Sequence, residues 1–71
     1  MNKSELRAQM ARHGDTGQTL SRALGISMQA FSEKINARRT FKQTEIQVII
    51  DRYNLNAEDT QKIFFSVEVS D

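Results

Sequence analysis

Residues 16 to 36 read TGQTLSRALGISMQAFSEKIN, and this stretch predicts two short helices joined by a tight turn. Leu20, Ala23 and Leu24 recur at helical spacing, so they are expected to form one apolar stripe on the first helix. Gly25 follows at the point where the chain must turn sharply, because a positive φ costs a glycine little. The pattern is typical of a helix-turn-helix.

The second helix of this pair is expected to have an inner and an outer face. Ser27 is a good N-cap for it, and Phe31 and Ile35 lie four residues apart, so they should face the core. The outer face then carries amide, hydroxyl, carboxylate and thioether side chains, namely Met28, Gln29, Ser32, Glu33 and Asn36. Such side chains suit contacts with base edges in a DNA major groove. An ordinary helical hairpin without a nucleic-acid role is the alternative.

The motif and the residues after it carry a family resemblance. LSRALGISMQAFSEKIN (20–36), followed by ARRTFKQTEIQVII (37–50), resembles the small phage Cro- and CI-type regulators of the Xre-like helix-turn-helix family, as found in phages of Gram-positive bacteria. The resemblance extends from about Leu6 to Phe65. It implies an all-α fold, a compact five-helix lambda repressor-like domain over residues 1–65. It also implies a transcriptional regulator of a phage genetic switch that binds a double-stranded DNA operator in the bacterial host cell.

Three positions depart from the family pattern. Gly17 stands where the family usually has Gln at the start of the first motif helix, although Gln18 is adjacent. Ser21 replaces the usual Ala and is still small. Ala37 stands where Gly normally ends the recognition helix, so this C-cap is expected to be less favourable or differently shaped.

Positive charge gathers on and after the predicted recognition helix, although the formal net charge is only +1. Residues 22–42 hold five Lys and Arg against Glu33 alone, which gives +4, whereas residues 45–71 hold six acids against two basic residues, which gives −4. This distribution predicts contact with phosphate. The phosphate contacts are assigned to Thr16, Gln18, Ser27, Arg38, Arg39 and Lys42. A chance grouping of charge on a solvated face is the alternative.

Three further helices are predicted outside the motif. The first covers residues 2–13, with Asn2 and Glu5 as a capping box. Thr44 is expected to cap the next one after a loop at 37–43 that Phe41 pins to the core. The inner face of that helix follows the i, i+3, i+4, i+7 pattern with Ile46, Ile49, Ile50 and Tyr53. Asn56 is expected to cap the last helix, and Thr16 is expected to cap the first helix of the motif, with Asp15 as the alternative.

The C-terminal residues have a different period. Phe65, Val67 and Val69 alternate with polar residues, which predicts an extended segment over 66–71. Such a segment can pair with its copy in a second subunit and form a homodimer. A frayed tail is the alternative.

No motif for catalysis, metal binding or cofactor binding is present. The chain has no Cys, and its one histidine, His13, is assigned to the end of the first helix, where it meets the last carbonyls. There is no Gly-rich phosphate loop or metalloprotease motif. No apolar run approaches the ~20 residues of a membrane span. We therefore expect a cytoplasmic, soluble protein that is not an enzyme and has no catalytic residue, cofactor, metal or membrane contact.

A protein partner is the main alternative to DNA. An antirepressor or modulator with the same fold would bind a partner phage repressor and block or alter its DNA binding. The near-zero net charge favours this alternative, as does Glu33 on the outer face. The apolar side chains of Met28, Phe65, Val67 and Val69 favour it as well.

Overall fold

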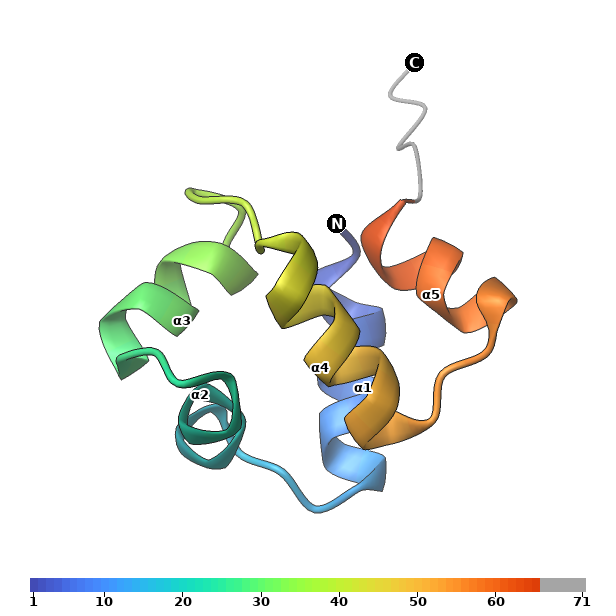
Figure 1. Ribbon diagram of the computed structural model, residues 1–71, viewed down its shortest axis with the longest axis horizontal. Coiled ribbons are helices and arrows are strands. Elements are labelled where there is room, and N and C mark those ends of the chain that lie inside the picture. The colour runs from blue at the N-terminus through green and yellow to red at the C-terminus, as the bar shows by residue number, and fades with distance from the viewer. Residues whose placement is uncertain (66–71) are drawn as a thin grey trace.

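The computed structural model describes residues 1–65, and every regular element among them is an α-helix (Figure 1). The helices are α1 (Lys3–Arg12), α2 (Gly17–Leu24), α3 (Met28–Ile35), α4 (Gln43–Tyr53) and α5 (Ala57–Phe64). The prediction of an all-α protein with five helices is confirmed. The predicted extended segment at 66–71 lies outside the described residues.

Polar caps set the helix starts, as the sequence predicts. The side chains of Asn2, Thr16, Ser27 and Asn56 each accept a hydrogen bond from the backbone N–H three residues later. The predicted capping box of α1 is incomplete, however. The Asn2 N–H donates to the carbonyl of Ile63 at 2.6 Å instead of to Glu5, so the cap also links α1 to α5.

The start of α4 differs from its prediction. Lys42, and not Thr44, is the N-cap, so the preceding loop is shorter than predicted. The carboxylate of Glu45, the third residue of the helix, accepts the N–H of the N-cap residue Lys42 at 2.8 Å, as the third residue does in a capping box. Thr44 lies within the first turn of the helix and is exposed.

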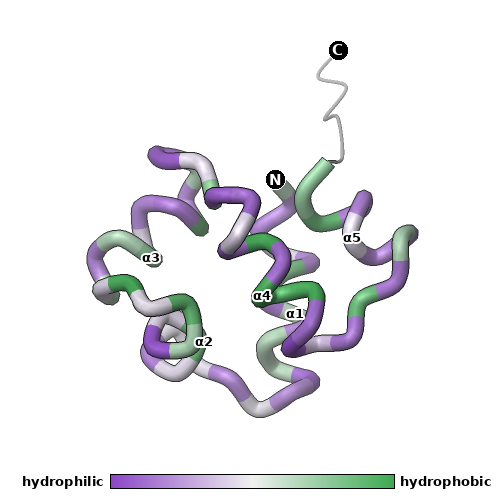
Figure 2. The backbone as a smooth tube through the Cα atoms, in the orientation of Figure 1, coloured by the Kyte–Doolittle hydropathy of each residue, from purple (hydrophilic) through white to green (hydrophobic). Residues whose placement is uncertain are grey.

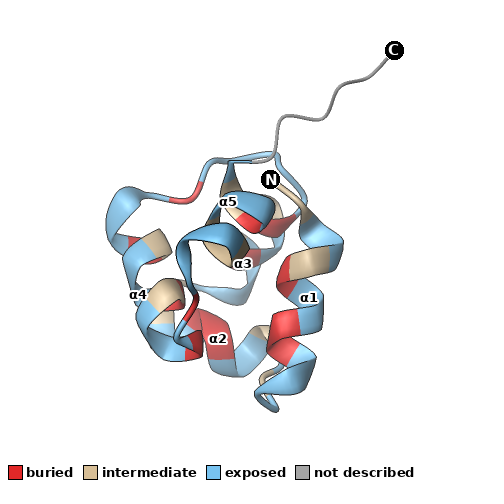
Figure 3. Cartoon of the chain, turned by 90° about the vertical axis from the view of Figure 1, so that its right-hand side faces the viewer, coloured by how far each residue is buried: buried red, intermediate tan, exposed pale blue. Residues whose placement is uncertain are grey.

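The core is built from all five helices. Leu6, Leu20, Ile49 and Ile63 are fully buried, and Phe31, Ile35, Phe41, Tyr53 and Leu55 pack around them. Figure 3 shows the buried residues on the inward sides of the helices. Ile46 and Ile50 are half-buried against this core, which matches the stripe predicted for α4. Burial of these side chains is the main force that holds such short helices together.

The stripe predicted for α2 is partly wrong. Ala23 is exposed, and Ser21 is buried in its place. The Ser21 hydroxyl donates to the Gln18 carbonyl at 2.9 Å, so its burial leaves no polar group unpaired. The small side chain lets α2 pack closely on α3, as the substitution for Ala had suggested.

The packing order places α3 at one side of the molecule. α2 packs against both α3 and α4, while α1 packs against α5, and Figure 1 shows α3 and α5 at opposite sides with α4 between them. Figure 2 shows hydrophobic residues gathered on α4 and hydrophilic stretches on α3 and the loop after it. No helix among residues 1–65 is long and apolar enough to cross a membrane.

Candidate functional site

The outer face of α3 is arranged as its sequence predicts. Gly25 adopts φ 72° after α2, and the chain enters α3 after only Ile26 and Ser27. Phe31 and Ile35 are buried, whereas the predicted base-contact residues lie on the part of the helix that faces away from the core. Of these, Met28, Gln29, Ser32 and Asn36 are exposed, and Glu33 is half-buried. The structure therefore brings the five residues together on one solvent-facing surface, which we call the α3 face.

Lys34 is not one of the surface cations, although the charge count over residues 22–42 included it. Its side chain is only 3% exposed, and its Nζ lies 2.6 and 2.7 Å from the two carboxylate oxygens of Glu45. Burial by itself raises the pKa of Glu45. The Lys34 ammonium and the Lys42 N–H lower the pKa by more than burial raises it, so the carboxyl stays ionised. The pair joins the end of α3 to the start of α4.

The loop after α3 exposes its cations while its centre is fixed to the core. Arg38, Arg39 and Lys42 are exposed, and Phe41 is buried in edge-on contact with Phe31 and with Phe64. The Arg39 guanidinium lies 3.4 Å from a Glu33 carboxylate oxygen. Phe41 thus holds the three predicted phosphate contacts beside the C-terminal end of α3.

Ala37 adopts a backbone conformation that favours glycine. Its φ is 62°, in the left-handed region, where a Cβ costs roughly 1–2 kcal/mol. The backbone N–H groups of Arg38 and Arg39 both donate to the carbonyl of Glu33, at 2.8 and 3.2 Å, and close the end of the helix. The turn after α3 is therefore closed by backbone hydrogen bonds, with backbone strain at Ala37 beside the cations.

The start of α2 presents two of the other predicted phosphate contacts, Thr16 and Gln18, which are exposed. Thr16 and Thr19 cap each other reciprocally, and the Thr19 hydroxyl also donates to Asp15 Oδ1 at 2.8 Å. Ser27, the last predicted phosphate contact, is exposed at the start of α3 while its Oγ accepts the Ala30 N–H.

A polar network that sequence reasoning missed fixes the turn before α2. Arg52 donates two hydrogen bonds to Asp15, at 2.7 and 2.8 Å, and the Tyr53 hydroxyl donates a third at 2.7 Å. The bonds from Arg52 hold the pKa of Asp15 well below its usual range, and burial raises the pKa of Tyr53 above its usual range. The ring of His13 stacks on Tyr53 at 4.7 Å, which corrects the expectation that it meets the carbonyls of α1.

Two cations of α1 extend the α3 face, and the sequence had given them no role. Lys3 Nζ lies 2.6 Å from Asn36 Oδ1. Arg7 lines a hollow of about 250 Å³ beside α3. The other lining residues are Met10, Gly17, Met28, Phe31, Ser32, Ile35 and Asn36. Lys3 and Asn36 are 33 residues apart, so the sequence carries no signal for this contact.

Gly17 keeps this hollow open. A Cβ at position 17 would lie 3.3 Å from a ring carbon of Phe31 and 3.4 Å from the methyl of Met28. Met28 itself is 49% exposed, and its sulfur lies 3.5 Å from the Ser21 hydroxyl. Gly17 therefore leaves the edge of the α3 face next to Phe31 and Met28 without a side chain.

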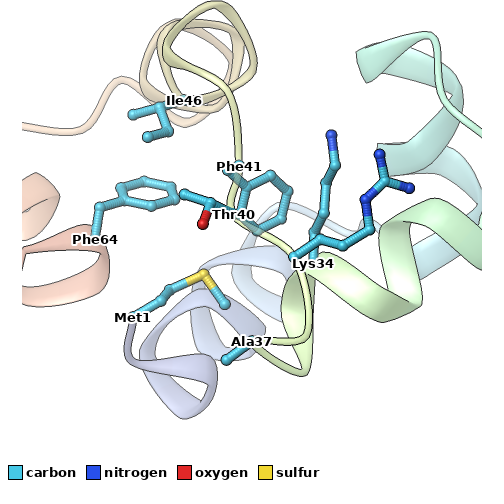
Figure 4. Close-up of a pocket in the computed structure, with 8 residues that line it drawn as sticks. Met1, Lys34, Ala37, Thr40, Phe41, Ile46 and Phe64 are labelled. Atoms are coloured by element: carbon cyan, nitrogen blue, oxygen red, sulfur yellow. The ribbon is translucent and has the colours of Figure 1, made fainter.

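A second, smaller hollow lies on the other side of the α3–α4 loop. It measures about 160 Å³, and Figure 4 shows Met1, Phe41, Ile46 and Phe64 converging on it from four segments of the chain. Arg39 also lines it, and Phe65 next to Phe64 is 54% exposed. No group of three or more His, Asp or Glu side chains with metal-binding geometry occurs among residues 1–65.

Residues 2–67 match the family described as Protein of unknown function (DUF739). The chain belongs to this family. Comparison with curated proteins and with solved structures gives no match. The DUF739 match includes all five helices, so the α3 face and the cations around it lie within the family region.

Proposed function

We propose that this DUF739 protein is a sequence-specific, double-stranded DNA-binding transcriptional regulator with a Cro/CI-like helix-turn-helix fold. The observation that carries the proposal is the position of the basic loop residues. Arg38, Arg39 and Lys42 are exposed beside the end of a short helix whose outer face is polar. A recognition helix needs such a polar face for bases and adjacent cations for the DNA backbone.

In this proposal α3 enters the major groove, and each exposed residue has a chemical role. Gln29 pairs with adenine through its amide, Met28 contacts thymine methyl groups, and Glu33 accepts from cytosine N4. Ser32 reaches either bases or phosphate. The backbone contacts are made by Thr16, Gln18, Ser27, Arg38, Arg39 and Lys42. A dimer would place two such helices on half-sites about 34 Å apart.

Because Lys34 is buried, fewer cations are available to contact phosphate than the sequence predicts. Four exposed basic residues remain within 22–42, and one of them, Arg39, faces Glu33. The electrostatic contribution is therefore carried mainly by Arg38 and Lys42, with Arg39 and the cations of α1 in support. Binding is expected to depend on salt with a modest slope, because each phosphate neutralised contributes about −0.9 to the slope of log K against log salt.

The test is duplex binding at several salt concentrations. Simultaneous Arg38→Ala and Arg39→Ala substitution is expected to weaken binding to all sequences and to reduce the salt slope by about two. Arg12→Ala with Lys62→Ala removes the same charge from the end of α1 and from α5, and should leave the slope nearly unchanged. An unaltered slope in the Arg38/Arg39 variant would remove these residues from the interface. No binding of the unaltered protein to any duplex from a randomised pool would refute the function.

A second candidate function is binding to a phage repressor as an antirepressor. The observation that favours it is the hollow beside α3, whose floor includes Phe31 and Ile35 and whose rim holds the half-exposed Met28. An apolar side chain of a protein fits such a hollow better than a phosphate does. Gly17→Ala would fill part of the hollow. If the function is repressor binding, this variant should weaken capture of the repressor and leave DNA affinity unchanged.

A further inference from the structure

The α3 face is continued by the first turn of α1. Lys3 is exposed, and its ammonium donates to Asn36 Oδ1 at 2.6 Å. Asn36 is the C-cap residue of α3, so the contact lies at one end of the predicted reading surface. The structure thereby adds a side chain from outside the helix-turn-helix to that surface.

The contact changes what Asn36 can recognise. An asparagine recognises adenine with its acceptor and its donor together. Here Asn36 Oδ1 already accepts from Lys3, and Asn36 Nδ2 lies 3.4 Å from the Ser32 hydroxyl oxygen. Three donors remain, namely the other two N–H groups of the Lys3 ammonium and the second hydrogen on Nδ2, against one acceptor, the second lone pair of Oδ1.

We propose that Lys3 and Asn36 form a donor-rich subsite that reads guanine in the major groove. Guanine presents two acceptors there, N7 and O6, whereas adenine places its N6 donor next to N7. An adenine or a cytosine at this position would place its amino group, a donor, against the donors of Lys3 and Asn36. The inference rests on the proposed DNA binding and adds to it a base identity and a specificity-determining residue on α1.

The experiment compares sequence selection by three proteins from one pool of randomised duplexes. These are the unaltered protein, Lys3→Met, and Lys62→Met, which removes the same charge from α5. The unaltered protein and Lys62→Met are expected to enrich one guanine that Lys3→Met leaves undefined. Replacing this guanine with adenine, or with 7-deazaguanine to remove N7 alone, should weaken the unaltered protein about tenfold and Lys3→Met hardly at all.

Asn36→Ala is the second variant. Without its partner the ammonium of Lys3 loses its fixed position, so the preference for this guanine over adenine should fall in the same selection experiment. Helical circular dichroism of each variant confirms that the fold is kept.

Two results would overturn the assignment of a guanine to Lys3 and Asn36 and leave the proposed DNA binding in place. One is the same guanine preference in Lys3→Met as in the unaltered protein. The other is that Lys3→Met binds every sequence equally more weakly and that its slope of log K against log salt is smaller by about one, which would make Lys3 a phosphate contact. Failure of the unaltered protein to bind any duplex would overturn the proposed function together with this inference.

Discussion

The two ends of α4 are both held by an ion pair, but the two pairs differ in exposure and in number of partners. At the N-terminal end, Glu45 meets Lys34 with both side chains buried. At the C-terminal end, Asp15 is buried, while the side chain of Arg52 is 39% exposed. Asp15 also accepts bonds from Tyr53 and Thr19. The first pair joins α4 to α3, and the second joins it to the turn before α2.

The difference in exposure and in number of partners shows which of the two ion pairs can be broken by the loss of a single side chain. A buried charge that loses its only counter-charge has no solvent to replace it, so the remaining group is strongly unfavourable. Asp15 has three side-chain donors, so the loss of one leaves two. The ion-pair link between α3 and α4 therefore depends on a single pair, whereas the turn before α2 is held redundantly.

The largest expected effect comes from breaking the buried pair on one side. Glu45→Ala should lower the free energy of unfolding by about 3 kcal/mol, because it leaves the Lys34 ammonium buried without a partner. Urea denaturation followed by circular dichroism measures the change. The matched control is the double variant Lys34→Met/Glu45→Leu, which removes both charges and should recover most of the loss. A double variant as unstable as Glu45→Ala would contradict this account.

A smaller effect is expected at the other end of α4. Asp15→Asn keeps the size of the side chain but removes its charge, and should cost about 1–2 kcal/mol, since neutral hydrogen bonds replace charge-assisted ones. Thermal unfolding at neutral pH gives the value. Asp51→Asn on the exposed side of α4 is the control and should change little. A cost above that of Glu45→Ala would reverse the ranking of the two ends.

Acid should act on the same carboxylates. The pKa values of Asp15 and Glu45 lie below their ordinary values in the folded protein. Their contribution is therefore complete above about pH 5, where the unfolded carboxyls are ionised, and declines as the pH falls below about 4. Unfolding measured from pH 7 to pH 2 should show this decline, and Asp15→Asn should show a shallower one. An equal slope in both proteins would exclude Asp15 as a source of the acid sensitivity.

The smallest expected effect concerns the strained residue between α3 and α4. Ala37→Gly should raise the free energy of unfolding by about 0.5–1 kcal/mol, because φ 62° is cheap for glycine, although the unfolded chain gains entropy. Ala57→Gly, at the first position of α5, is the control with the opposite expected sign, and it should lower the free energy of unfolding. If Ala37→Gly also destabilises, the turn is not under strain at this residue.

The local features of the fold were predictable because they depend on neighbours within four residues. The caps at Thr16, Ser27 and Asn56 and the left-handed Gly25 all follow from short-range hydrogen bonds or φ preference. The exceptions are instructive. Thr44 was predicted as a cap from its own chemistry, but α4 begins directly after Lys42, whose N–H donates to the carboxylate of Glu45.

The candidate site was predictable only in part. The α3 face follows from the helical period, which separates Phe31 and Ile35 from the polar residues. Charge counting placed Lys34 with the surface cations, and only its burial against Glu45 removes it from them. Lys3 and Arg7 had no signal, because nothing in a helix period reveals which distant helix lies beside it.

The sequence by itself determined the five helices, most of their caps and turns, and which side of α3 faces the solvent. These features depend on periodicity and local backbone preference, which a linear chain records directly. The tertiary structure alone decided which charges are paired, which remain on the surface, and which residues of α1 join the α3 face. Those outcomes depend on burial and on contacts across 11 to 38 positions, from Lys34–Glu45 to Asp15–Tyr53, where spacing carries no information.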